Sequence, residues 1–302
     1  GKVRVVAPTV ETASSPAGTP CYFFNMEDNS WNGVSADRIK VYEMTTDWTN
    51  TANSAVVLTR TLNTTAFDGS FPGTWDDIAQ PGTTQKLDAI AGVFNFRAQY
   101  MRWGGYNTVV LCNVVDVNGS DHAGVRWYEL RDADDGQWNI YQQGTWSPDA
   151  AHRWIGSIAM DNQGNIGLAY SYSDPANNGY PGLRYTGRYA SDPLGQMTVA
   201  EQVGMNGTAS QSGINRYGDY AHMSLDPNGT TFWYTGEYIG SGGNTRTRIF
   251  SFDLAADVSV QEHDPLYATA SLQVIDQDGI LAVANRAQDE ARIPQMACEK
   301  TK

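Results

Sequence analysis

The chain has little cysteine, few basic residues and no long apolar run, and each shortage excludes a class of protein. Three cysteines occur in 302 residues, without a Cys-x-x-Cys or Cys/His cluster, which excludes a disulfide framework and a zinc site of that type. Lysine and arginine number 20 against 33 aspartates and glutamates, and no basic block is present, so we expect no nucleic-acid partner. No segment approaches the roughly 20 apolar residues that span a bilayer, so we expect no membrane insertion.

Glycine and aromatic residues are abundant instead. The sequence holds 30 Gly, 16 Tyr and 9 Trp, a composition that favours strands and turns over helices. Strand-like runs joined by Gly, Asn and Asp turns recur in units at 20–62, 95–145, 150–205 and 212–263. The last run of each unit alternates apolar and polar residues, as a half-exposed outer strand does. These closing runs are 54–61, 136–143, 195–202 and 256–263.

The repeat predicts an all-β fold, namely a β-propeller of four-stranded antiparallel blades. An immunoglobulin-type sandwich would not repeat the same order of four strands. At least four blades lie in this chain, and the tail, lost upstream sequence or a neighbouring subunit could complete the ring. We expect a leading strand and linker at 1–19, the propeller at 20–263 with an insertion at 63–94, and a C-terminal hairpin and tail at 264–302. Insertions of this length are usually functional or structural clamps.

One turn recurs with recognisable chemistry. An aspartate in a tight hairpin can accept turn N–H bonds, a following glycine suits a left-handed backbone, and a later aromatic ring packs between strands. We therefore expect these residues to lock hairpins rather than to perform chemistry. They are Ser224, Asp226, Gly229 and Trp233 in the first copy, and Asp161 and Gly164 in a looser second copy.

These turns belong to longer stretches that resemble a known group of proteins. DRIKVYEMTTDW, AGVRWYELR, LRYTGRYASDPLGQM and RYGDYAHMSLDPNGTTFWYTGEY are similar to the sialidase-like, Asp-box β-propeller regions of large secreted or surface-exposed bacterial proteins. The resemblance covers roughly residues 20–253. It implies a propeller at an extracellular or cell-surface location, and it says more about the fold than about the function.

A candidate ligand site comes from arginines that precede aromatic residues. In a propeller they could meet at one mouth of the central channel and hold a carboxylate or sulfate. A nearby aspartate could face the channel as an acid or a calcium ligand, and the aromatic rings could stack on sugars. The alternative is that each arginine braces its own blade and that the rings pack between blades. The candidates are Arg102, Arg153, Arg216, Asp219, Trp103, Trp154 and Tyr217.

The cysteines and histidines point to no cofactor. Cys112 lies in an apolar run and is expected to be a small buried hydrophobe. Cys21 and Cys298 lie near opposite ends of the chain and could form a disulfide in an oxidising compartment. No histidine spacing indicates a metal site. We therefore expect no cofactor, with calcium left open.

The leading functional hypothesis is an extracellular, non-catalytic propeller that serves as a binding, adhesion or assembly module of a larger bacterial surface protein. Its partner would be a glycan or another protein subunit, and the apolar hairpin of the tail could give a homo-oligomer. Adjacent Tyr and Glu residues cannot form a sialidase couple, because neighbouring strand residues point to opposite faces. Two alternatives stay open: a sialidase-type glycoside hydrolase that uses Asp219 and the arginines, and a structural subunit of an extracellular filament or sheath.

Overall fold

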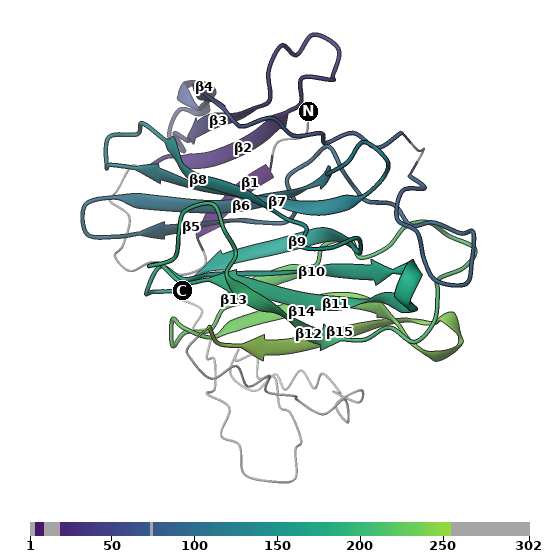
Figure 1. Cartoon of the computed structure of the whole chain (residues 1–302). Coiled ribbons are helices and arrows are strands. Elements are labelled where there is room, and N and C mark those ends of the chain that lie inside the picture. Colours follow the sequence, from purple (N-terminus) through teal and green to yellow (C-terminus); the bar gives the residue numbers. More distant parts are fainter. Residues whose placement is uncertain (1–3, 9–18, 73–74, 255–302) are drawn as a thin grey trace, which may run out of the picture. The chain divides into compact units, whose positions relative to one another are not determined.

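The computed structural model describes residues 4–8, 19–72 and 75–254. In this part the chain forms antiparallel strands in successive sheets, which confirms the predicted all-β propeller of four-stranded blades (Figure 1). The strands are β1 (Arg4–Pro8), β2 (Cys21–Glu27), β3 (Arg38–Thr45), β4 (Ala55–Asn63), β5 (Ala98–Arg102), β6 (Asn107–Asp116), β7 (Ala123–Asp132), β8 (Asn139–Trp146), β9 (His152–Met160), β10 (Ile166–Asp174), β11 (Gly179–Arg188), β12 (Val199–Met205), β13 (His222–Leu225), β14 (Phe232–Ile239) and β15 (Thr245–Phe252). Single turns of 3₁₀ helix are η1 (Thr51–Asn53), η2 (Pro175–Asn177) and η3 (Ser241–Gly243).

Each blade runs from an inner strand to an outer one through consecutive antiparallel pairs. The four strands β9 to β12 form one sheet of their own, and β13 to β15 form a three-stranded sheet. The outer strands β4, β8 and β12 carry many exposed residues, whereas every residue of β6 is buried. This difference explains why the closing runs alternate in polarity and the middle runs do not. The fourth closing run, 256–263, and the predicted tail hairpin lie outside the described residues.

The first blade takes its inner strand from the segment predicted to be a leading strand and linker. β1 pairs antiparallel with β2, where Arg4 lies opposite Phe24, and parallel with β5, where Val6 lies opposite Ala98. It therefore joins the first two blades into one eight-stranded sheet. The sequence gives little sign of this, because five residues are too few to show a period and the second partner is distant in the chain.

Three inner strands meet around one serine. The Ser157 hydroxyl of β9 donates to the carbonyl oxygen of Phe96, just before β5, at 3.0 Å, and accepts the N–H of Met223 in β13 at 2.9 Å. The Gln99 carboxamide of β5 donates to the Met160 carbonyl at 3.0 Å and accepts the Met160 N–H. β5 and β9 thus run in the same direction, side by side. We call this meeting point of the inner strands the hub.

The segments that lead into β5, β9 and β13 form what we call the loop face, made of residues 64–72, 75–97, 147–151 and 206–221. The insertion reaches distant blades there. The Asp88 N–H donates to the Asn215 carbonyl at 2.8 Å, and the Ser173 hydroxyl of β10 donates to the Ala79 carbonyl at 2.8 Å. The insertion therefore clamps loops that are far apart in the sequence.

Aromatic rings fill the spaces between blades. Trp138 lies edge-on to Tyr22 of the first blade, with ring centroids 5.2 Å apart, and Tyr185 of the third blade stacks on Phe252 of the fourth at 4.0 Å. Cys112 is 2% exposed, as expected for a small buried hydrophobe. These contacts account for the high aromatic content of a chain with few leucines.

Both aspartate turns are held by their carboxylates. Asp226 accepts the Asn228 N–H and the indole N–H of Trp233, each at 2.9 Å, and Ser224 lies opposite Trp233 in the β13–β14 pair. Gly229 has a φ of 81°, a backbone that glycine adopts without strain. In the second copy, Asp161 accepts the N–H groups of Gln163 and Asn165 at 2.8 and 2.9 Å, and Gly164 has a φ of 84°.

Candidate functional site

Acidic side chains surround Arg216 on the loop face. Its Nε donates to Asp219 Oδ2 at 2.5 Å, and its Nη1 lies 3.4 Å from Oδ2 of Asp88 in the insertion. Glu237, near the end of β14, accepts the Gly218 N–H at 3.0 Å. The Arg216 side chain is 54% exposed, so the group is open to solvent. We call Asp88, Arg216, Asp219 and Glu237 the Arg216 cluster.

The two carboxyl groups beside Gly218 differ in their electrostatic environment. Burial raises the pKa of Glu237, and the charge of Asp219 adds to this, against the Gly218 N–H and Thr245, which lower it. The hydrogen bond from Arg216 to Asp219 raises the pKa of Arg216, so this guanidinium stays charged beside the carboxylate. The cluster thus pairs a carboxyl group whose pKa is raised by burial with a carboxyl group that accepts a hydrogen bond from a guanidinium. Such a contrast is typical of acid/base chemistry.

Two exposed aromatic residues flank the cluster, and both have left-handed backbones. Tyr220 follows Asp219, is 72% exposed and has a φ of 63°. Trp75 is 69% exposed with a φ of 66°, and its carbonyl accepts the side-chain amide of Asn215, next to Arg216, at 2.9 Å. Backbone strain of this kind is found most often at functional sites. Exposed aromatic rings are also surfaces on which sugar rings stack.

The three predicted arginines do not meet at one mouth, so that prediction is wrong. Arg102 is the last residue of β5, whereas Arg153 is the second residue of β9, which places them at opposite ends of parallel inner strands. Arg102 binds Asp134 at 2.9 Å, and the Arg153 side chain has no exposed surface. Similar sequence runs thus begin at different points of their blades. Of the three, Arg216 alone is largely exposed.

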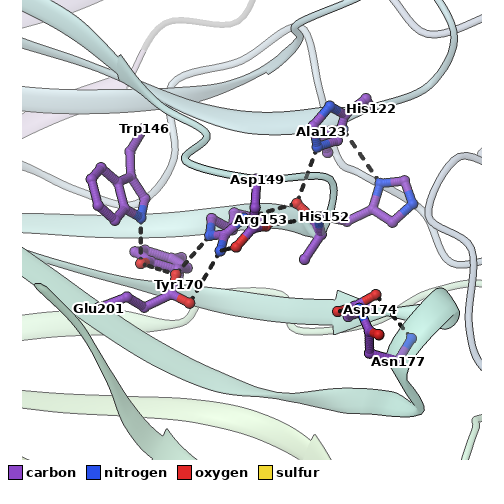
Figure 2. Close-up of polar contacts among 11 residues, drawn as sticks. His122, Ala123, Trp146, Asp149, His152, Arg153, Tyr170, Asp174, Asn177 and Glu201 are labelled. Carbon is purple, nitrogen blue, oxygen red and sulfur yellow. Dashed lines mark hydrogen bonds and ion pairs between the residues drawn. The ribbon is translucent and has the colours of Figure 1, made fainter.

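Arg153, whose side chain is fully buried, is the centre of a hydrogen-bond network between the second and third blades (Figure 2). Its guanidinium donates to Asp149 at 2.8 Å and to Glu201 at 2.6 Å. Glu201 also accepts the Tyr170 hydroxyl at 2.6 Å, and the Trp146 indole donates to that hydroxyl at 2.5 Å. Burial alone would lower the pKa of Arg153, but the bonds to Asp149 and Glu201 outweigh it and raise that pKa.

This network contains a Tyr–Glu pair, Tyr170 and Glu201, whose members lie on different strands and not next to each other in the sequence. Burial, followed by the charge of Glu201, raises the pKa of Tyr170 well above its ordinary value. Glu201 lies close enough to act as a base, but Tyr170 has no exposed surface, so its hydroxyl cannot reach a substrate as a nucleophile. The pair is a structural contact between β10 and β12.

The predicted aromatic platforms lie mostly inside the protein. Trp154 is buried, and its ring centroid lies 5.4 Å from that of Tyr217, which is also buried. The Tyr217 hydroxyl donates to the Glu237 carbonyl at 2.7 Å, so this pair supports the cluster from within. Trp103 stacks on Tyr106 at 5.9 Å, beyond the last residue of β5. Of the two exposed rings of the loop face, Tyr220 lies in the predicted run Arg216-Tyr217-Gly218-Asp219-Tyr220, whereas Trp75 was missed because it lies outside the Arg-aromatic repeat.

The sequence left a calcium site and a disulfide open. In the described part of the chain no group of three or more His, Cys, Asp or Glu side chains could hold a metal ion. Cys298 lies outside the described residues, so its pairing with Cys21 stays a prediction. Among the residues that the structure covers, no helix is long and apolar enough to cross a membrane.

Comparisons with known proteins yield only distant structural likenesses. No protein-family model and no curated protein matches the chain. A GH43 endo-arabinanase from Bacillus licheniformis is 12% identical over 81% of this chain and 72% of its own, with a TM-score of 0.35. An α-L-arabinofuranosidase from Lactobacillus brevis is 14% identical over 86% and 74%, with a TM-score of 0.42. A xylan β-1,4-xylosidase from Bacillus halodurans is 10% identical over 88% and 41%, with a TM-score of 0.39.

These matches correct the leading functional prediction. The structures named above are all those of glycoside hydrolases, and the prediction of a non-catalytic binding or assembly module is wrong on this finding. None of the three is a sialidase, so the resemblance to sialidase-like Asp-box proteins gains no support from them. With TM-scores below 0.5, the likeness does not specify a reaction, and the function has to be argued from the side chains.

Proposed function

We propose that the chain is a glycoside hydrolase whose reacting groups are Glu237 and Asp219. The contrast between these two carboxyl groups carries the proposal. Glu237 is half-buried with a raised pKa, whereas Asp219 lies 2.5 Å from the Arg216 guanidinium. Glycoside hydrolysis commonly uses two carboxyl groups in opposite protonation states, one on each side of the scissile bond.

Each residue of the Arg216 cluster has a role in this proposal. Glu237 is the general acid, and its proton passes to the glycosidic oxygen as the bond to the anomeric carbon breaks. Asp219 is the partner carboxylate: it stabilises the positive charge that develops on the sugar and takes a proton from the water molecule that forms the new bond to the anomeric carbon. Arg216 holds Asp219 through a hydrogen bond from its Nε. Asp88 holds Arg216 from the insertion.

A sialidase-type reaction is a weaker candidate. It requires an activated tyrosine beside a glutamate, and Tyr170, which donates to Glu201, is buried. It also requires a group of arginines, whereas Arg102 and Arg153 each bind acidic residues elsewhere. We therefore propose two-carboxylate hydrolysis of a glycan, and we keep an extracellular or surface location as part of the proposal.

The proposal is tested with aryl glycosides that differ in their leaving group. The wild-type chain should hydrolyse at least one member of a panel of arabinofuranosides, xylosides and sialosides. Glu237→Gln should lower kcat by about 10²–10⁴-fold on a substrate with a poor leaving group. The loss should be much smaller on a dinitrophenyl glycoside, because that leaving group needs no proton. Asp219→Asn should lower the rate on both.

Asp76→Asn is the matched control, because Asp76 is an exposed acid on the same loop face, next to Trp75. Its rates should equal those of the wild type. The absence of turnover on the whole panel would contradict the proposal. So would a Glu237→Gln variant, shown to be folded by circular dichroism, that loses the same factor on both leaving groups.

A further inference from the structure

Two basic side chains lie at the start of inner strands from different blades. Arg97 immediately precedes β5, and His222 is the first residue of β13. The ring centroids of Phe96 and His222 are 5.1 Å apart. The Ser157 hydroxyl binds the backbone of both Phe96 and Met223, the direct neighbours of the two basic residues. The hub therefore brings Arg97 and His222 together.

Neither side chain has a polar partner for its buried nitrogen within the described residues. Arg97 Nε and His222 Nε2 are both buried there without a hydrogen bond. Burial lowers the pKa of Arg97, and burial followed by the charge of Arg97 lowers the pKa of His222. No carboxylate in the described part of the chain contributes to either shift.

Among the described residues Arg126 and Arg188 also lack an acidic partner, but each guanidinium donates to several oxygen atoms. Arg102, Arg153 and Arg216 each bind an acidic side chain. The formal charge is −13, so acidic residues are plentiful. A half-buried guanidinium without a counter-charge destabilises a fold, so a ligand that supplied the missing negative charge would bind favourably there.

We propose that Arg97 and His222 bind the carboxylate group of a ligand at the hub. A guanidinium presents parallel N–H donors that match a carboxylate, and the imidazole of His222 adds another donor. Phe96, which is 37% exposed, offers an apolar surface to the rest of the ligand. A sugar acid and a small free acid share this chemistry. The site lies outside the Arg216 cluster and does not depend on the proposed hydrolysis.

Isothermal titration calorimetry on the full chain tests the site with three probes: sodium galacturonate, sodium acetate and neutral galactose. Galacturonate should bind and galactose should not. Binding of acetate as well would support recognition of any small carboxylate, whereas its absence would support recognition of a sugar acid. Arg97→Gln should weaken galacturonate binding about 10-fold or more, since a hydrogen bond to a charged group is lost.

Arg246→Gln is the control, because it makes the same change of charge at an exposed position of β15. Its affinity for galacturonate should be that of the wild type. Arg97→Gln should stay folded, because it removes a charge without a partner among the described residues, and thermal unfolding checks this. Failure of both anions to bind the wild-type chain would overturn the site. An equal loss in Arg97→Gln and Arg246→Gln would also overturn it.

Discussion

Glu237 and Glu27 are glutamates in opposite electrostatic environments. Burial is the main cause of the raised pKa of Glu237. Burial acts in the same direction on Glu27, but its contacts with Lys40 and Arg38, each at 2.5 Å, outweigh it and lower that pKa. The two residues should therefore affect stability with opposite signs as the pH changes.

We predict that Glu237→Gln makes the protein more stable than the wild type at pH 7. A raised pKa means that the folded state holds a proton that the unfolded state has released, so stability falls as the pH rises from the unfolded value of about 4.5 through the folded pKa. Glutamine does not ionise, and the gain should disappear below that window. Urea unfolding at several pH values measures the difference.

Glu27→Gln is the comparison with the opposite sign. Its lowered pKa contributes stability above the unfolded value, and that contribution is lost as the pH falls through the folded pKa. This variant should be less stable than the wild type at pH 7 and approach it in acid. If both variants shifted in the same direction at pH 7, the assigned environments would be contradicted.

At the residue scale, the sequence could predict contacts within one loop but not contacts between residues that are distant in the chain. Asp219 and Arg216 are three residues apart, and their pairing follows from one loop. Glu237 was excluded as half of a Tyr–Glu catalytic couple because its neighbour Tyr238 points to the other face of the strand, and this exclusion is correct. In the proposed site the partner of Glu237 is Asp219, which lies in the loop before β13. Arg97 was missed because alanine follows it, so it has no Arg-aromatic signature.

At the scale of elements, the Arg153 network joins β8, β9, β10 and β12. We predict that Arg153→Met destabilises the protein by about 3–5 kcal/mol, because it leaves the mostly buried Glu201 carboxylate without its cation. Arg102→Met should cost about 1 kcal/mol or less, since Arg102 is itself partly exposed and its one acidic partner among the described residues, Asp134, is 37% exposed. Chemical denaturation of both variants measures the contrast. An equal loss of unfolding free energy in both variants would mean that the Arg153 network does not stabilise the contact between the blades.

Strands could be predicted well where the chain repeats itself and poorly where it does not. The outer strands β4, β8 and β12 were recognised because each lies at the edge of its blade and carries residues that meet water, on nearly every position of β4. β1 was left in a segment of strand and linker because its pairing depends on β2 and β5 rather than on its own pattern. The misplaced arginines have the same origin, since a short motif fixes no position along a blade.

For the molecule as a whole, the insertion is the segment that links distant blades. The Gln80 carboxamide accepts the Gln211 N–H at 2.8 Å and donates to the Gln211 carbonyl at 3.2 Å, and both residues are 3% exposed. Gln211 belongs to the segment 206–221 that carries Arg216 and Asp219. The clamp therefore acts directly on the loop that bears half of the Arg216 cluster.

We predict that Gln80→Ala destabilises the protein by about 2–3 kcal/mol, because a buried N–H and a buried carbonyl lose their partner. The amide of Gln211 should exchange its hydrogen faster, since local opening of 206–221 no longer breaks that bond. Gln196→Ala, at an exposed side chain, should change stability by less than about 0.5 kcal/mol. Native-state hydrogen exchange decides the matter. Unchanged exchange at the Gln211 amide would show that the insertion does not hold the loop 206–221. Faster exchange at Gln211, with exchange in β13 and β14 unaffected, would identify the insertion as the element that positions Arg216 and Asp219.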